Sequence, residues 1–275
     1  MTGGSILITG CSSGIGLDAA RTLRDRGWRV FAACRKPEDC ETLRAEGMAG
    51  SPRLDYEDAD TIASALAEVL DATGGTLDAL FNNGASAIPG LVEDMPTDAL
   101  RATFETNFFG WHTLTRQVIP VMRAQGTGRI VQNSSVLGFA AMPWRGAYNA
   151  TKFALEGFTD TLRMEMVGTG IHVSLIEPGP ITSRFRANAK ANFERWIDWR
   201  ASARRADYEV QIERLGTSEP AKFELPPAAV TTRLIHAIES SRPRPRYYVT
   251  VPTHLGGVMK RLLPTRALDR ILSKG

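Results

Sequence analysis

Tyr148 and Lys152 stand four residues apart near the start of a predicted helix over 147–168, so both side chains project from one face of that helix. A phenol donates a proton poorly at neutral pH, but a neighbouring ammonium lowers its pKa toward that range. The pair could therefore transfer a proton to the oxygen of a carbonyl group that is being reduced. Because this spacing also arises by chance, the pair alone is weak evidence for that chemistry.

Three further polar residues fall where such a reaction needs them. Ser134 and Ser135 close a predicted strand at 129–133, and Asn107 lies inside a predicted helix at 97–123. A serine hydroxyl can hold a substrate oxygen near the phenol, and an asparagine midway along a helix can anchor a water chain through a locally distorted turn. The spacing from Tyr148 favours Ser135 over Ser134, which is the alternative.

A glycine-rich loop separates the first predicted strand, 5–9, from the first predicted helix, 14–26. Such a turn lets the backbone approach a pyrophosphate, and the free amides of the following helix favour negative charge. The glycine spacing differs from the more familiar pattern and could belong to a turn without a ligand. Its place between strand and helix predicts dinucleotide binding by Gly10, Ser12, Ser13, Gly14, Ile15 and Gly16.

Arg35 and Lys36 follow the second predicted strand, at the position that reads the adenosine ribose of a dinucleotide. An acid there bonds the two ribose hydroxyls, whereas a base accommodates a 2′-phosphate. With two cations and no acid at this position, we expect a preference for NADP(H) over NAD(H). The alternative interpretation is a solvated basic pair on a loop.

Short apolar runs alternate with helical patterns along the chain. Most runs are continuous, as in strands that are covered on both faces. The pattern predicts a single α/β domain over 1–275, a Rossmann-type doubly wound parallel β-sheet of about seven strands with helices on both faces. The predicted strands are 5–9, 29–34, 51–54, 79–82, 129–133, 172–176 and 247–251, and the predicted helices are 14–26, 38–46, 58–73, 97–123, 147–168 and 227–239.

Two segments break this alternation. Residues 184–225 are too many for a plain connection and include an amphipathic run, so we interpret them as a helical substrate-binding lid. Residues 252–275 show two short amphipathic patterns separated by Pro264, which predicts a basic C-terminal appendage. That appendage could pack on its own subunit, on a partner or on a membrane surface.

The composition, 43% hydrophobic and 23% charged residues, is that of an ordinary globular protein. The net charge of +3 is uneven, because residues 242–275 hold eight Lys or Arg against Asp269 and so carry +7, which leaves −4 for the rest. A mildly acidic body argues against a nucleic-acid binder. The basic tail is either a solvated surface or a contact for an anionic surface.

Other features bound the location and the chemistry. No apolar run approaches the roughly 18 to 20 residues of a membrane-spanning helix, and no basic leader precedes the first strand, so we expect neither a transmembrane segment nor export. The three cysteines, Cys11, Cys34 and Cys40, cannot all be paired, which favours a reduced, cytoplasmic protein. The four histidines lack metal-ligand spacing, so no metal is expected.

In its motifs the chain resembles the short-chain dehydrogenase/reductase family. The resemblance spans residues 5 to about 183 and rests on the 9–16 loop, Asn82, Asn83, Asn107, Ser135 thirteen residues before Tyr148, Lys152, Pro178 and Gly179. One departure is visible, because Gly84 and Ala85 stand in the reverse of the family's usual order. Both residues are small, so we expect the approach of the cofactor to be preserved.

The resemblance implies a role for each motif. Tyr148 would be the general acid/base, Lys152 would lower its pKa and bind the nicotinamide ribose, Ser135 would orient the carbonyl, and Asn107 would hold a relay water. The cofactor would also be lined by Asp55, Tyr56, Asn83, Gly84, Pro178, Gly179, Ile181 and Thr182.

Within the family, the stretches 145–152, 177–181 and 260–272 are similar to bacterial NADP-dependent aldehyde reductases and to the hydroxysteroid and retinol dehydrogenase-like branch. This similarity implies an apolar aldehyde, ketone or alcohol as substrate and a homodimer or homotetramer. The expected substrate contacts are Ser135, Leu137, Met142, Trp144, Phe185 and Trp196. Two alternatives are a non-catalytic NADP(H)-sensing regulatory protein and a membrane-surface-associated protein that acts through the basic tail.

Overall fold

The computed structural model describes residues 3–216 and 221–273 of the chain. Within this part, six parallel strands form one sheet in the order β2-β1-β3-β4-β5-β6. The strands are β1 (Ser5–Thr9), β2 (Arg29–Ala33), β3 (Ala79–Asn82), β4 (Gly128–Asn133), β5 (Ile171–Glu177) and β6 (Arg246–Tyr248). The direction of strand succession reverses between β1 and β3, where an open α/β sheet leaves a crevice beyond the carboxyl ends of its strands. The predicted doubly wound parallel sheet is confirmed.

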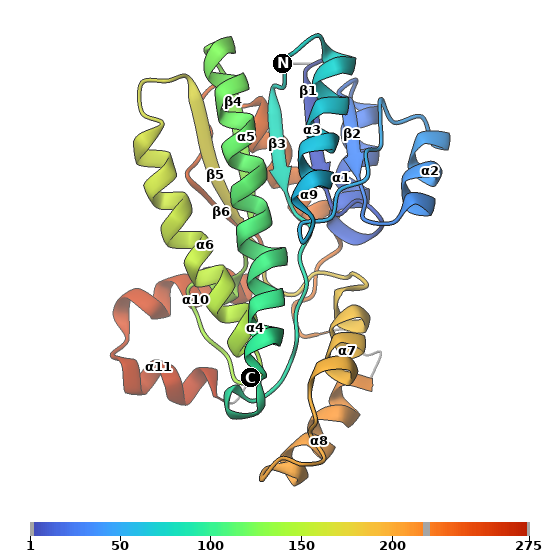
Figure 1. Cartoon of the computed structure of the whole chain (residues 1–275). Helices are drawn as coiled ribbons and strands as arrows, with labels where there is room; N and C mark the ends of the chain where they lie inside the picture. Colours follow the sequence, from blue (N-terminus) through green and yellow to red (C-terminus); the bar gives the residue numbers. More distant parts are fainter. Residues whose placement is uncertain (1–2, 217–220, 274–275) are drawn as a thin grey trace.

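Helices cover both faces of the sheet, as Figure 1 shows. One face packs against α1 (Gly14–Asp25), α2 (Pro37–Ala45) and α9 (Ala228–Glu239), and the other packs against α3 (Ala59–Thr73), α5 (Gly110–Gln125) and α6 (Gly146–Glu165). In β1, Ile6 and Ile8 belong to the first cluster of buried apolar side chains and Leu7 belongs to the second. This double burial explains why the strands read as unbroken apolar runs.

The predicted third strand, 51–54, is wrong: residues 50–54 form only isolated bridges to the β2 edge, at Phe31 with Gly50 and at Cys34 with Arg53. The interruption lies at Pro52, which has no N–H to donate to the ladder. The hydroxyl of Ser51 donates instead to the Ala32 carbonyl, at 2.6 Å. The segment follows the sheet edge without joining it as a strand.

The long predicted helix at 97–123 is divided into three pieces. Helix α4 (Thr97–Phe104) passes through a π-helical turn (Glu105–Phe109) into α5. Asn107 lies in this π turn and is buried. Because π turns lengthen the helical hydrogen-bonding pattern locally and are frequent at functional sites, the expected distorted turn at Asn107 has a definite form here.

The segment predicted as a lid, 184–225, contains α7 (Phe185–Trp196) and α8 (Arg205–Gly216), and residues 217–220 of it lie outside the described residues. Phe193 of α7 and Tyr208 of α8 pack with Ile88 and Leu91 in a third buried cluster. The Tyr208 hydroxyl accepts from the Leu91 N–H at 3.0 Å and donates to Asp94 at 2.9 Å. The two helices are thereby fastened to the loop that follows β3.

The C-terminal appendage has the expected two pieces, α10 (Val251–Leu262) and α11 (Thr265–Leu272), separated at Pro264. The last predicted strand, 247–251, is partly wrong because β6 ends at Tyr248 and Val251 already begins α10, with Pro252 in its first turn. Residues 274 and 275 lie outside the described part. Among the described helices, none has the length and apolar character needed to cross a membrane.

Candidate active site

Tyr148 and Lys152, on the first two turns of α6, lie side by side at the carboxyl edge of the sheet. The Lys152 side chain is buried, and its Nζ donates to the Asn133 carbonyl at the end of β4, at 2.9 Å. The same Nζ lies 5.6 Å from the centroid of the Tyr148 ring and 4.2 Å from that of Trp111. The ammonium is therefore held between a carbonyl and two aromatic faces.

Ser135 and Ser134 have different surroundings. The Ser135 hydroxyl accepts from the Leu137 N–H at 3.1 Å, and hydrogen bonding to Ser135 lowers the pKa of Tyr148. The Ser134 hydroxyl is buried beside Glu156 and has no hydrogen-bond partner among the described residues. The geometry associates Ser135 with the phenol, in line with the spacing argument.

The direction of the Tyr148 pKa shift is opposite to the sequence-based expectation. Withdrawal of the phenol from water raises its pKa, and this outweighs the lowering by Ser135. Phe185 of α7 contributes to this environment, since its ring meets the Tyr148 ring edge-on with centroids 5.5 Å apart. Burial also lowers the pKa of Lys152 to about 7, although Glu156 opposes this shift. The amine therefore titrates near neutral pH.

The side chain of Asn107 forms hydrogen bonds to other residues of the chain. Its Oδ1 accepts from the Ser86 N–H at 2.8 Å, and its Nδ2 donates to the Ser86 carbonyl at 2.8 Å and to the Thr151 hydroxyl at 3.2 Å. These bonds tie the loop after β3 to α6 at Thr151, which lies between Tyr148 and Lys152 in the sequence. The water-holding role of Asn107 stays a prediction.

The glycine loop packs against the loop that follows β3. Gly10 has φ +69°, and a Cβ there would lie 2.6 Å from the Gly84 Cα. A Cβ on Gly16 would lie 2.3 Å from the Gly10 carbonyl oxygen. Asn83 closes the contact, since its Nδ2 donates to the Thr9 carbonyl at 3.0 Å. Both glycines are required by close backbone approach.

This loop fits the pyrophosphate of a dinucleotide. Helix α1 begins at Gly14, and the side chain of its N-cap, Ser13, makes no capping hydrogen bond. The first amides of α1 are thus left for an anion that lies at the carboxyl edge of β1. Gly14 has φ +57° and lies close to Ser183, since a Cβ on Gly14 would be 2.9 Å from the Ser183 side chain. Only glycine fits this position without strain.

Around the predicted adenosine position, Arg35 and Lys36 are exposed after β2. Arg53, which the sequence did not single out, joins them through its Nε, which donates to the Arg35 carbonyl at 3.3 Å. Asp55 is half-buried, and its Oδ1 accepts from the Glu57 N–H at 3.1 Å. The Tyr56 ring faces the core, so only its backbone is left for the predicted contact with adenine.

The predicted nicotinamide end is the turn after β5. The Pro178 carbonyl accepts from the Val136 N–H at 2.8 Å, and Gly179 approaches Thr250 so closely that a Cβ would meet its Oγ1 at 2.2 Å. The Thr182 hydroxyl donates to Glu224 at 2.8 Å, and Ile181 bridges to Leu225. This turn is held between the segment that follows Ser135 and residues Glu224 and Leu225.

The predicted substrate residues fall into two groups. Phe185, Leu137 and Met142 lie on segments next to Tyr148, whereas Trp144 and Trp196 pack with the third buried cluster, to which α7 and α8 contribute. Trp144 meets the Tyr208 ring edge-on at 4.9 Å between centroids and has φ +65°. The structure thus brings Phe185 directly to the phenol and assigns the two tryptophans mainly to the packing of α7 and α8.

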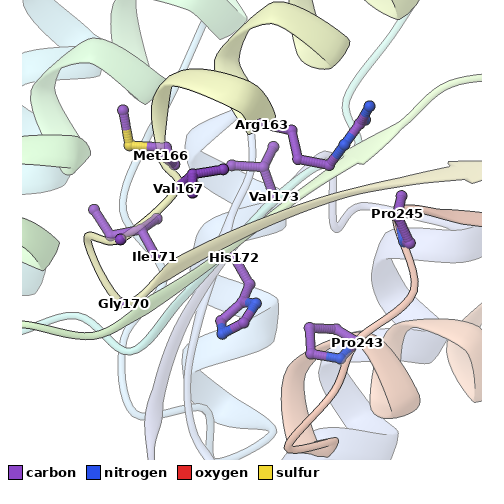
Figure 2. Close-up of a pocket in the computed structure, with 10 residues that line it drawn as sticks. Arg163, Met166, Val167, Gly170, Ile171, His172, Val173, Pro243 and Pro245 are labelled. Atoms are coloured by element: carbon purple, nitrogen blue, oxygen red, sulfur yellow. The ribbon is translucent and has the colours of Figure 1, made fainter.

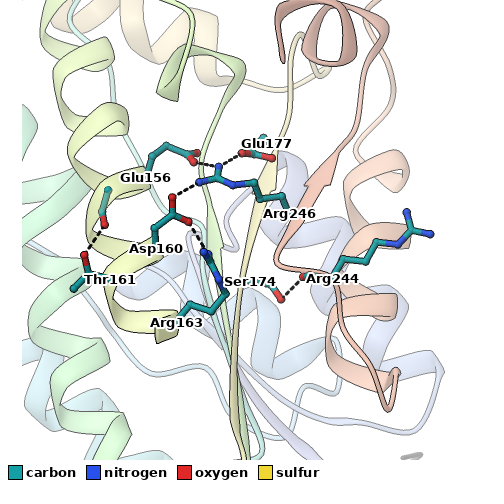
Figure 3. A network of polar contacts seen from close by, with 9 residues as sticks. Glu156, Asp160, Thr161, Arg163, Ser174, Glu177, Arg244 and Arg246 are labelled. Carbon is teal, nitrogen blue, oxygen red and sulfur yellow. Dashed lines mark hydrogen bonds and ion pairs between the residues drawn. The ribbon is translucent and has the colours of Figure 1, made fainter. Parts of the chain in front are cut away.

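A charged network that the sequence analysis missed begins one helical turn after Lys152. Arg246 of β6 donates to Glu156, to Asp160 and to Glu177, as Figure 3 shows. The sequence offered one clue to this network, because Glu156 lies four residues after Lys152 on the same helix. The other two chain segments that contribute to it, β5 with Glu177 and β6 with Arg246, are distant in the sequence. This network sets part of the electrostatic environment of Lys152, because Glu156 raises the pKa of that amine.

A hollow of about 260 Å³ lies at the other end of the sheet (Figure 2). It is lined by Arg163, His172, Pro243, Pro245 and neighbouring residues at the amino end of β5. The residues discussed above sit at the carboxyl ends of the strands, where a doubly wound sheet binds its ligands. We therefore place the candidate active site there and not in this hollow. No metal-binding group of His, Cys, Asp or Glu is found in residues 3–216 and 221–273.

The chain belongs to the short-chain dehydrogenase/reductase family, because residues 5–194 match the family model described as short chain dehydrogenase. It is 41% identical over 268 residues to the uncharacterized oxidoreductase YbbO of Escherichia coli strain K12, covering 98% of this chain and 93% of that protein. It is 36% identical over 192 residues to retinol dehydrogenase 8 of Homo sapiens, covering 68% and 62%.

Two solved structures are also similar. A short chain dehydrogenase/reductase from Burkholderia phymatum in complex with NAD has a TM-score of 0.79 and 25% identity, covering 98% of this chain and 95% of that chain. Actinorhodin polyketide ketoreductase, as a single-residue variant with NADPH, has a TM-score of 0.73 and 27% identity, covering 90% and 95%. Together with the family match, these similarities identify the chain as an oxidoreductase that acts on alcohol and carbonyl groups.

Proposed function

We propose that the protein interconverts an apolar aldehyde or ketone and its alcohol with NADP(H), and that Tyr148 exchanges the proton. The observation that carries this proposal is the meeting of Tyr148, Lys152 and Ser135 at the sheet edge where the glycine loop leaves its amides free for an anion. Position and chemistry agree there, since ligands of doubly wound sheets bind beyond the carboxyl ends of the strands.

The chain's own residues would divide the work as follows. The Ser135 hydroxyl orients the substrate oxygen, and the Tyr148 hydroxyl donates a proton to it during reduction or accepts one during oxidation. Lys152, fixed by the Asn133 carbonyl, supplies positive charge that makes loss of the phenol proton easier when the amine is protonated. When bound, the nicotinamide supplies or accepts the hydride.

The cofactor would be held by the residues predicted for it. The amides of the glycine loop and α1 would bind the pyrophosphate, Asn83 and Gly84 would line the middle of the site, and the 178–182 turn would border the nicotinamide. Arg35 and Lys36 support the choice of NADP(H), and Arg53 adds a third cation beside them. The two solved neighbours carry different cofactors, so this preference rests on the basic residues.

The apolar substrate class is supported by the surroundings of the phenol. Phe185 lies against Tyr148, and Leu137 and Met142 lie on the loop that follows Ser135. One relative is named a retinol dehydrogenase, and one structural neighbour is named a polyketide ketoreductase. An apolar carbonyl compound fits this combination. The expected homodimer or homotetramer stays a prediction, which light scattering of the purified protein tests.

The test of the catalytic role is Tyr148→Phe, with Tyr248→Phe as a control that removes a phenol hydroxyl from β6. We expect Tyr148→Phe to lower kcat for NADPH-dependent reduction of medium-chain aldehydes by about 10²- to 10⁴-fold while NADPH binding, followed by fluorescence, is unchanged. Retained turnover in Tyr148→Phe would reject the assigned role. Wild-type protein that binds NADPH but turns over no carbonyl compound would favour the sensing function.

The cofactor preference is tested separately by the double substitution Arg35→Ser with Lys36→Ser. We expect kcat/KM for NADPH to fall by about tenfold or more, because charge-assisted bonds to a phosphate are lost, while kcat/KM for NADH changes little. Equal losses with both cofactors would show that these residues do not read a 2′-phosphate.

A further inference from the structure

Helix α10 presents an apolar stripe to the outside of the molecule. Val251, Leu255, Val258 and Leu262 are 51%, 55%, 54% and 75% exposed. A helix turns about 100° per residue, so their spacing of four, three and four puts them within an arc of about 60°. Four large apolar side chains on one exposed face form a continuous surface and not scattered single residues.

The packing of the opposite face of α10 prevents this stripe from turning inward. Gly256 and Gly257 are buried, and a Cβ on Gly257 would lie 2.7 Å from the Tyr248 ring. A Cβ on Gly256 would contact Val136 and Phe139 at 3.4 Å. Because the two glycines allow this close approach, the rotation of the helix about its axis is set and the apolar side chains are left outside.

Basic residues accompany the stripe. Lys260 and Arg261 end α10, and Arg266 and Arg270 lie on α11, all of them exposed. No ion pair within 4.0 Å is formed by these four side chains with the described part of the chain. The surface therefore combines exposed apolar groups with uncompensated positive charge.

We propose that α10 and α11 dock on an anionic lipid bilayer, with the stripe Val251, Leu255, Val258 and Leu262 entering the boundary between headgroups and acyl chains. Such a boundary accepts an apolar helix face, and anionic headgroups attract the flanking Lys and Arg residues. A second copy of this chain fits less well, because a two-fold contact through α10 would bring the same cations of both copies together.

The position of α10 gives this docking a consequence that rests on the proposed function. The residues that α10 packs against, Val136 and Phe139, lie one and four residues after Ser135. Figure 1 shows α10 and α11 at the end of the molecule where the catalytic segments lie, away from α1 and α2. A bound bilayer would thus lie near the candidate active site, where an apolar carbonyl compound could enter from the lipid.

The test is sedimentation of the full chain with vesicles at neutral pH. Vesicles of equal parts phosphatidylserine and phosphatidylcholine should carry the protein down, whereas vesicles of phosphatidylcholine alone should not. The double variant Leu255→Gln with Leu262→Gln should reduce the bound fraction by about tenfold, since it removes two exposed leucines from the stripe. Val167→Gln, a change at an exposed apolar residue after α6, is the matched control and should bind like the wild type.

Three outcomes would overturn the proposal. One is equal sedimentation with both kinds of vesicle or with neither. Another is a leucine variant that binds like the wild type while Lys260→Glu with Arg261→Glu does not bind, which would mean adsorption by charge alone. The third is a leucine variant that halves the solution mass without changing vesicle binding, which would identify a contact between copies. NADPH-dependent turnover without vesicles should be the same in all variants, so a failure here is separate from a failure of the proposed function.

Discussion

Two polar clusters connect the sheet to the helices of one face, and one is made of neutral groups whereas the other is made of charged groups. The first, here called the neutral cluster, consists of Thr9, Tyr56, Asn82, Thr115 and Gln132. Asn82 donates to Thr115 and to Gln132 at 3.0 Å, and the Tyr56 hydroxyl lies 2.7 Å from the Thr9 hydroxyl and 2.8 Å from Asn82 Oδ1. It joins β1, β3, β4 and α5 beneath the glycine loop.

The second, here called the charged cluster, consists of Glu156, Asp160, Glu177 and Arg246. It joins α6, β5 and β6 beneath Tyr148 and Lys152, and three carboxyl groups share one guanidinium. Glu177 is 0% exposed, and burial together with Glu156 raises its pKa to about 8 despite Arg246. One oxygen of Glu156 and one of Glu177 have no hydrogen-bond partner among the described residues.

The difference teaches where pH acts on this fold. Burial raises the pKa of Tyr56 still further above neutrality, so nothing in the neutral cluster changes charge under ordinary conditions. In the charged cluster, the pKa of Glu177 is 4.5 in the unfolded chain and about 8 in the folded protein. Between these two pH values the folded protein keeps the Glu177 proton, whereas the unfolded chain has lost it. The unfolded state therefore binds fewer protons in that window, and this residue makes stability fall as pH rises through it.

The largest effect should come from removing the shared cation. We expect Arg246→Met to lower the free energy of unfolding by about 3–5 kcal/mol, because it leaves buried carboxyl groups without their counter-charge. Urea denaturation measures this loss. Arg244→Met, an exposed arginine two residues earlier, is the control and should change stability little. Equal losses of unfolding free energy in Arg246→Met and Arg244→Met would show that the charged cluster does not stabilise the fold.

An intermediate effect is expected in the neutral cluster. Asn82→Ala should lower the free energy of unfolding by about 1–3 kcal/mol, because Thr115 and Gln132 lose a buried hydrogen-bond partner. The loss should be the same at about pH 5 and about pH 9, since the side chains around Asn82 carry no charge in that range. A loss that varied with pH would contradict the separation of the two clusters.

The smallest effect per pH unit is expected at Glu177, where a substitution should change how steeply the free energy of unfolding depends on pH. Near pH 5, we expect Glu177→Gln to be as stable as the wild type to within about 1 kcal/mol, because an amide resembles the protonated carboxyl. As pH rises toward 8, the variant should gain stability relative to the wild type, by at most ~1.4 kcal/mol per pH unit for one proton.

Asp160→Asn is the matched control for that slope. Arg163 and Arg246 hold the pKa of Asp160 below its ordinary value, so its carboxylate stays charged above about pH 5. Its contribution is present above the unfolded pKa and is lost only as pH falls through the lower folded pKa. Asp160→Asn should therefore cost stability by a constant amount between pH 5 and 8, and a relative slope like that of Glu177→Gln would refute the assignment to Glu177.

The sequence by itself determined the parallel sheet, the glycine loop, the Tyr148 and Lys152 pair and the break at Pro264. These features depend on local spacing, since the pattern of apolar runs, a four-residue helical repeat and a proline act over a few residues. The failure of the predicted strand at 51–54 also had a local cause, because Pro52 cannot donate a ladder hydrogen bond.

Only the tertiary structure decided which distant residues meet. Glu177 and Arg246 are 69 positions apart, and Asp94 and Tyr208 are 114 apart, so no local pattern announces either contact. The same holds for the pKa of Tyr148, because burial outweighed the influence that spacing alone would suggest. The outward face of α10 likewise follows from the closeness of Gly257 to Tyr248, which depends on how two elements pack and not on the composition of either.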